Sequence, residues 1–382
     1  MYIISLFFIY LNISKEGYFV KQKYFDIILF ILVIAISIFG IIMIYSASNI
    51  WASFKFDDPF KFVKAQGIFF VFGVIGMFVL SKIDYKIYKK KANLILLICF
   101  LLLGLVLIPG VGSVRNGSRS WFGIGGFGIQ PSEFAKIGLI IYVSKYLSNN
   151  EKNMRSIIKG VFPILGVIGI FFLLIMLEPD FGTAMVIVLT LVCIIFISGV
   201  KISFFLKVGF LGLLGVVGLI IAAPYRMARI MSFLNPWTDP LGSGYQIIQS
   251  LYAIGPGGLL GQGFLNSRQK NFYLPEPQTD FIFSIISEEF GFLGILIVST
   301  FFIFIFYRIV KIAIASNDSF AKYLCFGLGF GIIIQAILNL MVVVGLIPVT
   351  GVTLPFFSYG GSSLLVSLAS IGIVLNVSRN QN

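Results

Sequence analysis

Residues 275–307 read PEPQTDFIFSIISEEFGFLGILIVSTFFIFIFY. After a polar start rich in proline, the part from 283 to 307 is apolar except for scattered hydroxyl residues and the adjacent carboxylates of Glu288 and Glu289. A helix needs about 20 predominantly apolar residues to cross the hydrocarbon core of a bilayer. This segment is long enough, so it predicts a membrane-spanning helix that is approached by a polar loop.

The composition of the whole chain points in the same direction. Of its 382 residues, 58% are hydrophobic and only 11% are charged. A soluble globular domain has about 45–50% apolar and about 25% charged residues. The composition therefore excludes a soluble enzyme, a disordered chain and a nucleic-acid-binding domain. We expect an all-α, polytopic integral membrane protein.

Similar apolar runs recur along the chain, and the same length criterion predicts ten transmembrane helices. They fall near residues 27–48, 65–81, 94–110, 132–148, 160–177, 183–200, 205–223, 283–307, 323–346 and 360–377. Residues 1–26 are expected to form a cytoplasmic N-terminal arm, and residues 27–382 a single transmembrane domain. The apolar run Met1–Ile13 lacks the flanking features of a signal peptide, so we expect it to lie on the membrane surface.

The distribution of charge predicts the orientation. The chain has 28 lysines and arginines against 15 acids, and its net charge is +13. Most of the basic residues fall on the side of the membrane that holds both predicted termini, and two thirds of the acids fall on the other. The positive-inside rule then places both termini in the cytoplasm. Because acids near a membrane are costly without a task or a partner, we expect any chemistry at the outer face.

The longest external segment is the loop 224–282 between the seventh and eighth predicted helices. It is rich in proline and glycine, and its stretch Gly244–Gly255 is expected to form a short helix at the membrane interface. Long, chemically varied loops on a rigid scaffold often carry functional sites.

The types of reactive residue narrow the chemistry. The chain has no histidine, which excludes a Ser-His-Asp triad, histidine metal ligands and a histidine base. Cys99, Cys193 and Cys325 all lie in apolar runs and are interpreted as packing residues. Proton transfer must therefore use Asp, Glu, Lys or Tyr.

The first candidate site lies at the end of the external loop. Thr279 or Asp280 can cap the eighth helix, and a purely capping role for Asp280 stays open. A functional role is favoured because Asp280 sits at the membrane boundary, with Glu288 two helical turns further along and near the same face. Glu288 and Glu289 are two adjacent carboxylates in an apolar run, which is costly unless they are paired or hydrated.

The second candidate is the segment QPSEFAK, residues 130–136. Pro131 at the first helical position predicts a helix start, and Glu133 and Lys136 are spaced to pair along the helix. The pair is interpreted either as stabilising a helix end or, together with Arg119, as part of a site for an anionic headgroup such as pyrophosphate.

Two further segments supply polar groups. Glu178 and Asp180 flank a proline between the fifth and sixth helices, where they form a tight turn or, with Glu133 and Asp280, contribute to a cation site. Oxygen ligands would suit Mg²⁺ or Mn²⁺, so either ion is a possible cofactor. The hydroxyl- and glycine-rich stretch 350–363 either lines a polar cavity or only turns the chain.

Taken together, these segments resemble the SEDS family (shape, elongation, division and sporulation) of ten-span bacterial membrane proteins. The resemblance covers nearly the whole chain after Lys23. The motifs NSRQK at 266–270, FYLPEP at 272–277 and TGVTLP at 350–355 are similar to the FtsW and SpoVE branch more than to the RodA branch. Gln278 departs from the many relatives that have a histidine there.

The resemblance implies a peptidoglycan glycosyltransferase of the bacterial cytoplasmic membrane, acting in cell division or in cell-shape and septal wall synthesis. Its substrate would be lipid II, and its partners a class B penicillin-binding protein and other divisome or elongasome membrane proteins, with no nucleic acid. The family's catalytic aspartate falls on Asp280, and its other functional positions fall on Glu133, Lys136 and Asp180. Arg119 and Glu288 join these as substrate-binding candidates from the residue patterns alone.

Two other functions remain open at this point. A lipid II flippase would use a similar charged cavity, but it needs polar groups along a full path across the membrane, whereas the charges here crowd the outer half. A non-enzymatic division scaffold would leave the charged residues at the helix ends unexplained.

Overall fold

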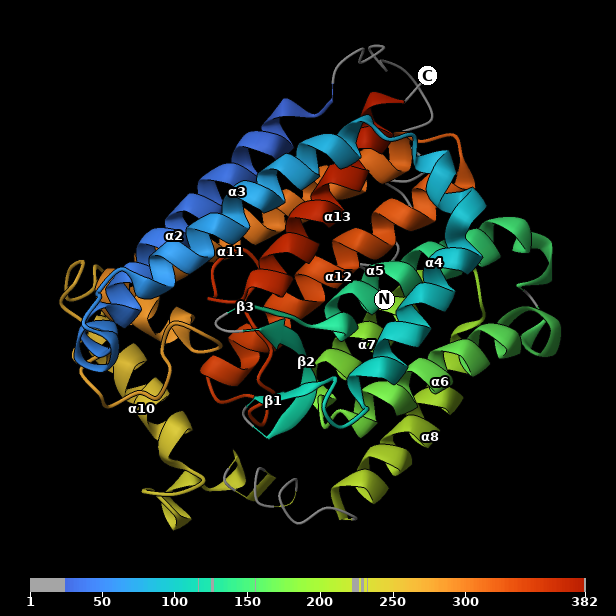
Figure 1. Ribbon diagram of the computed structural model, residues 1–382. Coiled ribbons are helices and arrows are strands. Elements are labelled where there is room, and N and C mark those ends of the chain that lie inside the picture. Colours follow the sequence, from blue (N-terminus) through green and yellow to red (C-terminus); the bar gives the residue numbers. More distant parts are fainter. Residues whose placement is uncertain are drawn as a thin grey trace.

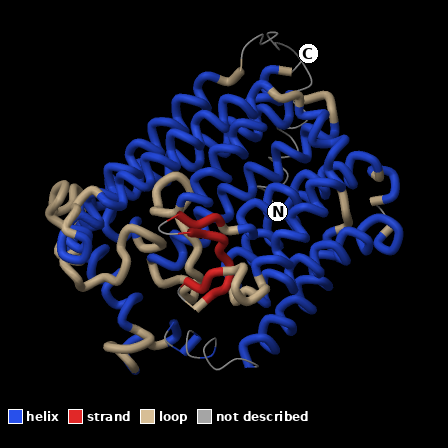
Figure 2. Tube along the Cα trace, viewed as in Figure 1, coloured by secondary structure: helices blue, strands red, loops and turns tan. Residues whose placement is uncertain are grey.

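The computed structural model describes residues 25–380, apart from residues 116, 125–126, 155, 222–226, 228–229 and 232. The described part is a bundle of helices with one small sheet, which lies left of centre in the lower half of the view (Figures 1 and 2). The longer helices are α2 (Ile27–Phe56), α3 (Lys61–Lys82), α4 (Tyr85–Val106), α5 (Pro131–Asn149), α6 (Phe162–Leu177), α7 (Phe181–Ile197), α8 (Ile202–Ile221), α11 (Ile282–Ala315), α12 (Ser319–Val343) and α13 (Gly361–Arg379). The short elements are η1 (Glu151–Asn153), η2 (Ile157–Val161), η3 (Pro236–Thr238), α10 (Tyr245–Ile254) and η4 (Gly255–Gly257).

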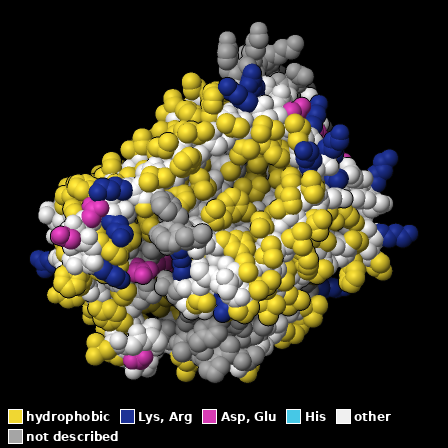
Figure 3. Space-filling model, viewed as in Figure 1, with side chains coloured by type: hydrophobic (Ala, Val, Ile, Leu, Met, Phe, Trp, Pro, Cys, Tyr) yellow, Lys and Arg dark blue, Asp and Glu magenta, His cyan; other side chains and the backbone are white. Residues whose placement is uncertain are grey.

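Each of the ten predicted segments falls on one of these longer helices. Among the described residues, six helices are long and apolar enough to cross a membrane, judged by length and composition: α2, α3, the continuous helix 157–177, α11, α12 and α13. Most of the face in Figure 3 is hydrophobic. Large apolar side chains such as Phe72 on α3 and Leu211 on α8 are well exposed, as expected for surfaces that contact lipid. The chain is therefore a polytopic membrane protein.

The helices α12 and α13 form the centre of the bundle, and nearly all side chains of α13 are buried. Since lipid tails are as apolar as leucine, close packing and buried polar contacts hold such helices together. A Cβ atom on Gly372 of α13 would lie 2.6 Å from the carbonyl oxygen of Met77, so glycine allows α3 to pack directly against α13. Asn376 adds polar contacts, because its side chain accepts from the Tyr85 N–H and donates to the Ser81 carbonyl, both at 2.9 Å.

The two ends of the described chain lie together. Asp26 caps α2 by accepting from the Leu29 N–H at 2.9 Å, and it forms an ion pair with Arg308. Its own N–H donates to Ser378 at 3.0 Å, near the end of α13. The described part of the chain therefore starts and ends on the same side of the bundle. The predicted arm 1–26 and the run Met1–Ile13 lie outside the described residues, apart from positions 25 and 26.

The all-α prediction is wrong in one respect, because the structure contains a small β-sheet. Strands β1 (Ser113–Arg115), β2 (Ser118–Ile124) and β3 (Phe127–Ile129) form an antiparallel sheet in the order β1-β2-β3, between α4 and α5. Two of its strands have only three residues, so no alternating pattern of apolar and polar residues is long enough to reveal them.

The predicted external loop is folded onto α11. As expected for Gly244–Gly255, it contains a helix, α10. Further along, the Gln262 N–H donates to the Glu288 carbonyl at 2.9 Å, and the Phe292 N–H donates to the Gly258 carbonyl at 2.9 Å. Between these contacts Gly291 has a φ of 61°, which interrupts the α-helical backbone of α11. The loop thus binds the backbone groups that this break releases.

Candidate functional site

A cavity of about 700 Å³ opens at the end of the bundle that carries the sheet. Its wall comes from the sheet, the N-terminal ends of α5 and α7, the end of the external loop, and the segment 350–361 between α12 and α13. The charged residues in its lining are Arg115, Glu133, Lys136, Asp180, Glu276 and Asp280. The prediction that the stretch 350–363 lines a polar cavity is therefore confirmed.

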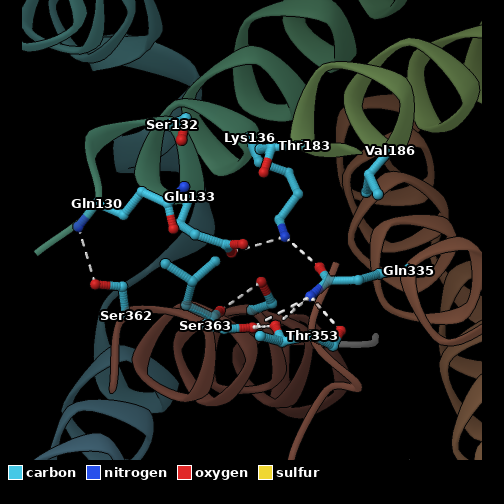
Figure 4. A network of polar contacts seen from close by, with 12 residues as sticks. Gln130, Ser132, Glu133, Lys136, Thr183, Val186, Gln335, Thr353, Ser362 and Ser363 are labelled. Atoms are coloured by element: carbon cyan, nitrogen blue, oxygen red, sulfur yellow. Dashed lines mark hydrogen bonds and ion pairs between the residues drawn. The ribbon is translucent and has the colours of Figure 1, made fainter. Parts of the chain in front are cut away.

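The helix α5 places an ion pair in this cavity. Pro131 is its first residue, as predicted, and the first turn carries Glu133. The Lys136 ammonium lies 2.9 Å from a Glu133 carboxylate oxygen, and both side chains are buried. The same ammonium donates to Gln335 of α12 at 2.5 Å (Figure 4). A buried ion pair needs such further hydrogen bonds to offset the loss of water.

Gln335 connects this pair to the opposite wall. Its amide donates to the Thr353 carbonyl and to the Ser363 hydroxyl, both at 3.1 Å (Figure 4). Gln335 was not among the residues predicted from the sequence, and neither was Asn339, four residues further along the same helix. Two amides one turn apart in the apolar run 323–346 were the signal that could have found them.

Asp180 combines a structural contact with a place in the cavity wall. One carboxylate oxygen accepts from the Thr183 N–H at 3.0 Å and so caps α7, which confirms the predicted turn. The other accepts from the Gln130 amide at 2.8 Å. Burial raises the pKa of the Asp180 carboxyl above its usual range, and the hydrogen bond from Thr183 opposes that shift.

Glu178, in the turn after α6, is fully buried. Neither of its carboxyl oxygens has a hydrogen-bond partner among the described residues. Burial, with a further contribution from the nearby Asp180, raises the pKa of Glu178 to about 9. The Glu178 carboxyl is therefore neutral near pH 7, and it does not line the cavity.

Asp280 lies in the cavity wall and is half-buried. The Thr279 hydroxyl donates to its carboxylate at 2.9 Å. The Asn339 amide donates to the Asp280 carbonyl at 2.6 Å and to the Val352 carbonyl at 2.8 Å, which fixes the backbone of Asp280 against α12. The capping interpretation is wrong, because α11 begins at Ile282 and has no side-chain cap.

The structure thus brings Asp280, Glu133, Lys136 and Asp180 to one cavity. Figure 3 shows acidic and basic side chains that adjoin in a hollow near the middle of an otherwise mostly hydrophobic face. It does not bring Glu288 there. The Glu288 carboxylate accepts from the Ser267 hydroxyl at 2.5 Å and from the Arg268 N–H at 2.8 Å.

The expectation that Glu288 shares a face with Asp280 is wrong because residue 280 precedes the helix, and because Glu288 faces the loop that packs at the break of α11. Glu289 is also paired: its carboxylate lies 3.1 Å from the buried Lys270 ammonium and accepts from Ser46 at 2.5 Å. The expectation that these adjacent acids need partners is confirmed.

Arg119 is also absent from the cavity wall, where Arg115 lies instead. Arg119 is on β2, opposite Val114 of β1. Which of the two arginines faces the cavity depends on the strands, and these were not predicted from the sequence.

The predicted cation site is not assembled. Within the described ranges, no three acids or cysteines lie close enough together to hold a metal ion, and the expected set of Asp280, Glu133 and Asp180 lines the cavity without forming such a cluster. The three cysteines are free, and Cys99 packs against Gly138 of α5, as expected for packing residues.

Comparisons with known proteins agree with this architecture. The model of the FtsW/RodA/SpoVE cell cycle protein family matches residues 26–382. Stage V sporulation protein E of Bacillus subtilis is 52% identical over 93% of this chain and 97% of its own length. A "Probable peptidoglycan glycosyltransferase FtsW" of Geobacter sp. strain M18 is 41% identical over 95% of this chain and 97% of its own length.

Solved structures are similar as well. A chain from a peptidoglycan synthase complex, described as coordinating polymerization and crosslinking, has a TM-score of 0.78 and 31% identity, covering 94% of this chain and 99% of that one. The rod shape determining protein RodA of Thermus thermophilus has a TM-score of 0.69 and 28% identity, with 94% and 97% covered. The chain belongs to the FtsW/RodA/SpoVE family of cell cycle proteins.

Proposed function

We propose that this chain is a peptidoglycan glycosyltransferase that polymerises lipid II at the outer face of the cytoplasmic membrane, in cell division or in cell-shape and septal wall synthesis. The observation that carries the proposal is the gathering of Asp280, Asp180 and the Glu133–Lys136 pair around one cavity at one end of a membrane bundle. Relatives that share more than nine tenths of its length are named as peptidoglycan glycosyltransferases.

The chemistry assigns roles to Asp280 and to the Glu133–Lys136 pair. The C4 hydroxyl of an acceptor sugar attacks C1 of a donor, the bond from C1 to the lipid pyrophosphate breaks, and C1 is inverted. Asp280 accepts the proton of the hydroxyl, because its carboxylate is half-buried in the cavity wall and its backbone is fixed against α12. Lys136, which Glu133 and Gln335 hold in place, offsets negative charge that develops on the pyrophosphate.

The same proposal includes a topology. All ten longer helices cross the membrane, residues 27–382 form a single domain, and both termini are cytoplasmic. The contact of Asp26 with Ser378 supports termini on one side, and the excess of basic residues there supports the cytoplasm. The cavity and the loop 224–282 then face outward, where the acceptor glycan lies.

A partner follows from one structural neighbour. A similar solved chain belongs to a synthase complex that coordinates polymerization and crosslinking. We therefore expect a class B penicillin-binding protein to bind this chain and supply the transpeptidase, within a larger set of divisome or elongasome membrane proteins.

The test uses the purified chain with its penicillin-binding partner and lipid II in detergent, where no bilayer exists for a flippase to act across. Glycan polymer should form, and Asp280→Ala should reduce its rate by at least about 100-fold, as expected for loss of a general base. Asp58→Asn, at an exposed acid that pairs with Lys64, is the matched control and should keep the wild-type rate. Absence of polymer with a competent partner would favour the flippase.

A further inference from the structure

The cavity contains a second cation that the proposed mechanism does not use. Arg115 ends β1, pairs with Ser118 of β2 across the hairpin, and lines the cavity. Its guanidinium carbon lies 5.2 Å from the centroid of the Trp121 ring, within the range of a cation–π contact. The arginine side chain is thus held over β2.

The end of this side chain rests on a glycine. A Cβ atom on Gly128 of β3 would lie 2.7 Å from Nη1, 2.8 Å from Cζ and 2.9 Å from Nη2 of Arg115. β1 pairs with the first half of β2 and β3 with the second half, so the guanidinium of Arg115 reaches from β1 to a glycine on β3. Because Gly128 has no side chain, the guanidinium can occupy the space next to its Cα atom.

The glycine itself is fixed in place. Ser362 of α13 donates to the Gly128 carbonyl at 3.3 Å and accepts from the Gln130 N–H at 3.0 Å. The sheet therefore has a fixed position against the bundle, and the guanidinium has a fixed position on the sheet.

The two cavity cations differ in their charge partners. Lys136 is paired with Glu133 and bound by Gln335, so much of its charge is already compensated. None of the ion pairs found in the described part of the chain includes Arg115. A planar guanidinium donates two parallel hydrogen bonds to phosphate oxygens, which a lysine ammonium cannot do.

We infer that Arg115, seated on Gly128 and Trp121, binds the diphosphate of a polyprenyl-diphosphate lipid in this cavity. This assignment rests on the proposed function for the identity of the lipid. It replaces Arg119 as the arginine that recognises the headgroup, and it makes Gly128 a positioning residue, because a side chain there would displace the guanidinium.

The experiment measures binding of undecaprenyl diphosphate and undecaprenyl monophosphate to the purified full chain in detergent by native mass spectrometry. The wild-type chain should bind the diphosphate more tightly than the monophosphate. Arg115→Gln should weaken diphosphate binding about tenfold or more and bring the two affinities close together, because it removes a charge-assisted bidentate contact. The affinity of Arg115→Lys for the diphosphate should lie between those of the wild-type chain and Arg115→Gln.

Gly128→Ala tests the geometry without removing the charge. It should weaken diphosphate binding nearly as much as Arg115→Gln, whereas Gly76→Ala on α3, where a Cβ meets nothing within 4 Å, should have no effect. Lys64→Gln removes an exposed positive charge elsewhere and should also leave binding unchanged. Monodisperse elution of each variant on size exclusion checks its fold.

The outcomes separate this inference from the proposed function. Wild-type diphosphate affinity in Arg115→Gln, or equal affinities for the two lipids in the wild-type chain, overturns the assignment even if the chain polymerises lipid II. Arg115-dependent binding of the diphosphate in a chain that makes no polymer supports the subsite and rejects the polymerase.

Discussion

Glu178 and Asp180 show how one turn gives two carboxyls different tasks. Asp180 has hydrogen bonds from Thr183 and Gln130 and reaches the cavity, whereas neither Glu178 oxygen finds a partner among the described residues. Burial without hydrogen bonds disfavours the charged form, so Glu178 is a neutral acid and Asp180 is the one placed for chemistry.

The neutral Glu178 predicts a pH-dependent stability. Its folded-state pKa of about 9 is far above the value of about 4.3 for an unfolded glutamate. Between these values the folded chain holds a proton that the unfolded chain has released. Its stabilising contribution is therefore complete below the unfolded pKa and falls by about 1.4 kcal/mol per pH unit as the pH rises toward the folded pKa.

Thermal melting in detergent between pH 5 and pH 9, with each pH value about one unit apart, measures this effect. Glu178→Gln keeps the shape and cannot ionise, so its melting temperature should fall less steeply with pH than that of the wild-type chain. Equal slopes for the two chains would show that Glu178 does not remain protonated in the fold.

At the scale of elements, contacts between α11 and the external loop stabilise both. The loop supplies backbone partners at the break near Gly291, and Lys270 of the loop forms a buried ion pair with Glu289 of α11, to which Ser46 of α2 also donates. Removing one member of a buried pair leaves an uncompensated charge, which typically costs about 3–5 kcal/mol.

Lys270→Met should therefore lower the melting temperature strongly, and the double variant Lys270→Met with Glu289→Leu should recover most of the loss, since no unpaired charge then remains. The same thermal melts in detergent give the coupling between the two positions. If the decrease in melting temperature of the double variant equals the sum of the decreases of the two single variants, the ion pair does not stabilise the contact between the loop and α11.

How far the sequence predicts these elements depends on the residues involved. The ten apolar runs predict the helices because a bilayer imposes a length and a composition on each of them. The sheet is missed because Ser113–Arg115 and Phe127–Ile129 are too short to show a period. The pairing of Glu288 with the loop is missed because its partners, Ser267 and Arg268, reach it only once the loop has folded onto α11.

For the whole molecule, four of the predicted site residues share one cavity: Glu133, Lys136, Asp180 and Asp280. They lie at or just before the N-terminal ends of α5, α7 and α11. Because the chain direction alternates in a bundle, these helices start on the same side. Gln335 lines the cavity from α12, Asn339 on the same helix binds the backbone of Asp280, and Arg115 enters the cavity from the sheet. These contacts depend on which face each helix turns inward. On α12 the two amides one turn apart indicate that face, whereas the position of Arg115 depends on strands too short to be predicted.

The most direct measurement is the rate of lipid II polymerisation by Asp280→Asn at saturating substrate, with the partner present and with lipid II binding measured in parallel. Asparagine keeps the shape of Asp280 but cannot accept the proton, so the turnover rate should fall at least about 100-fold while lipid II affinity changes little. A turnover rate within about threefold of the wild-type chain, in a variant that folds and binds normally, would contradict a general-base role for Asp280.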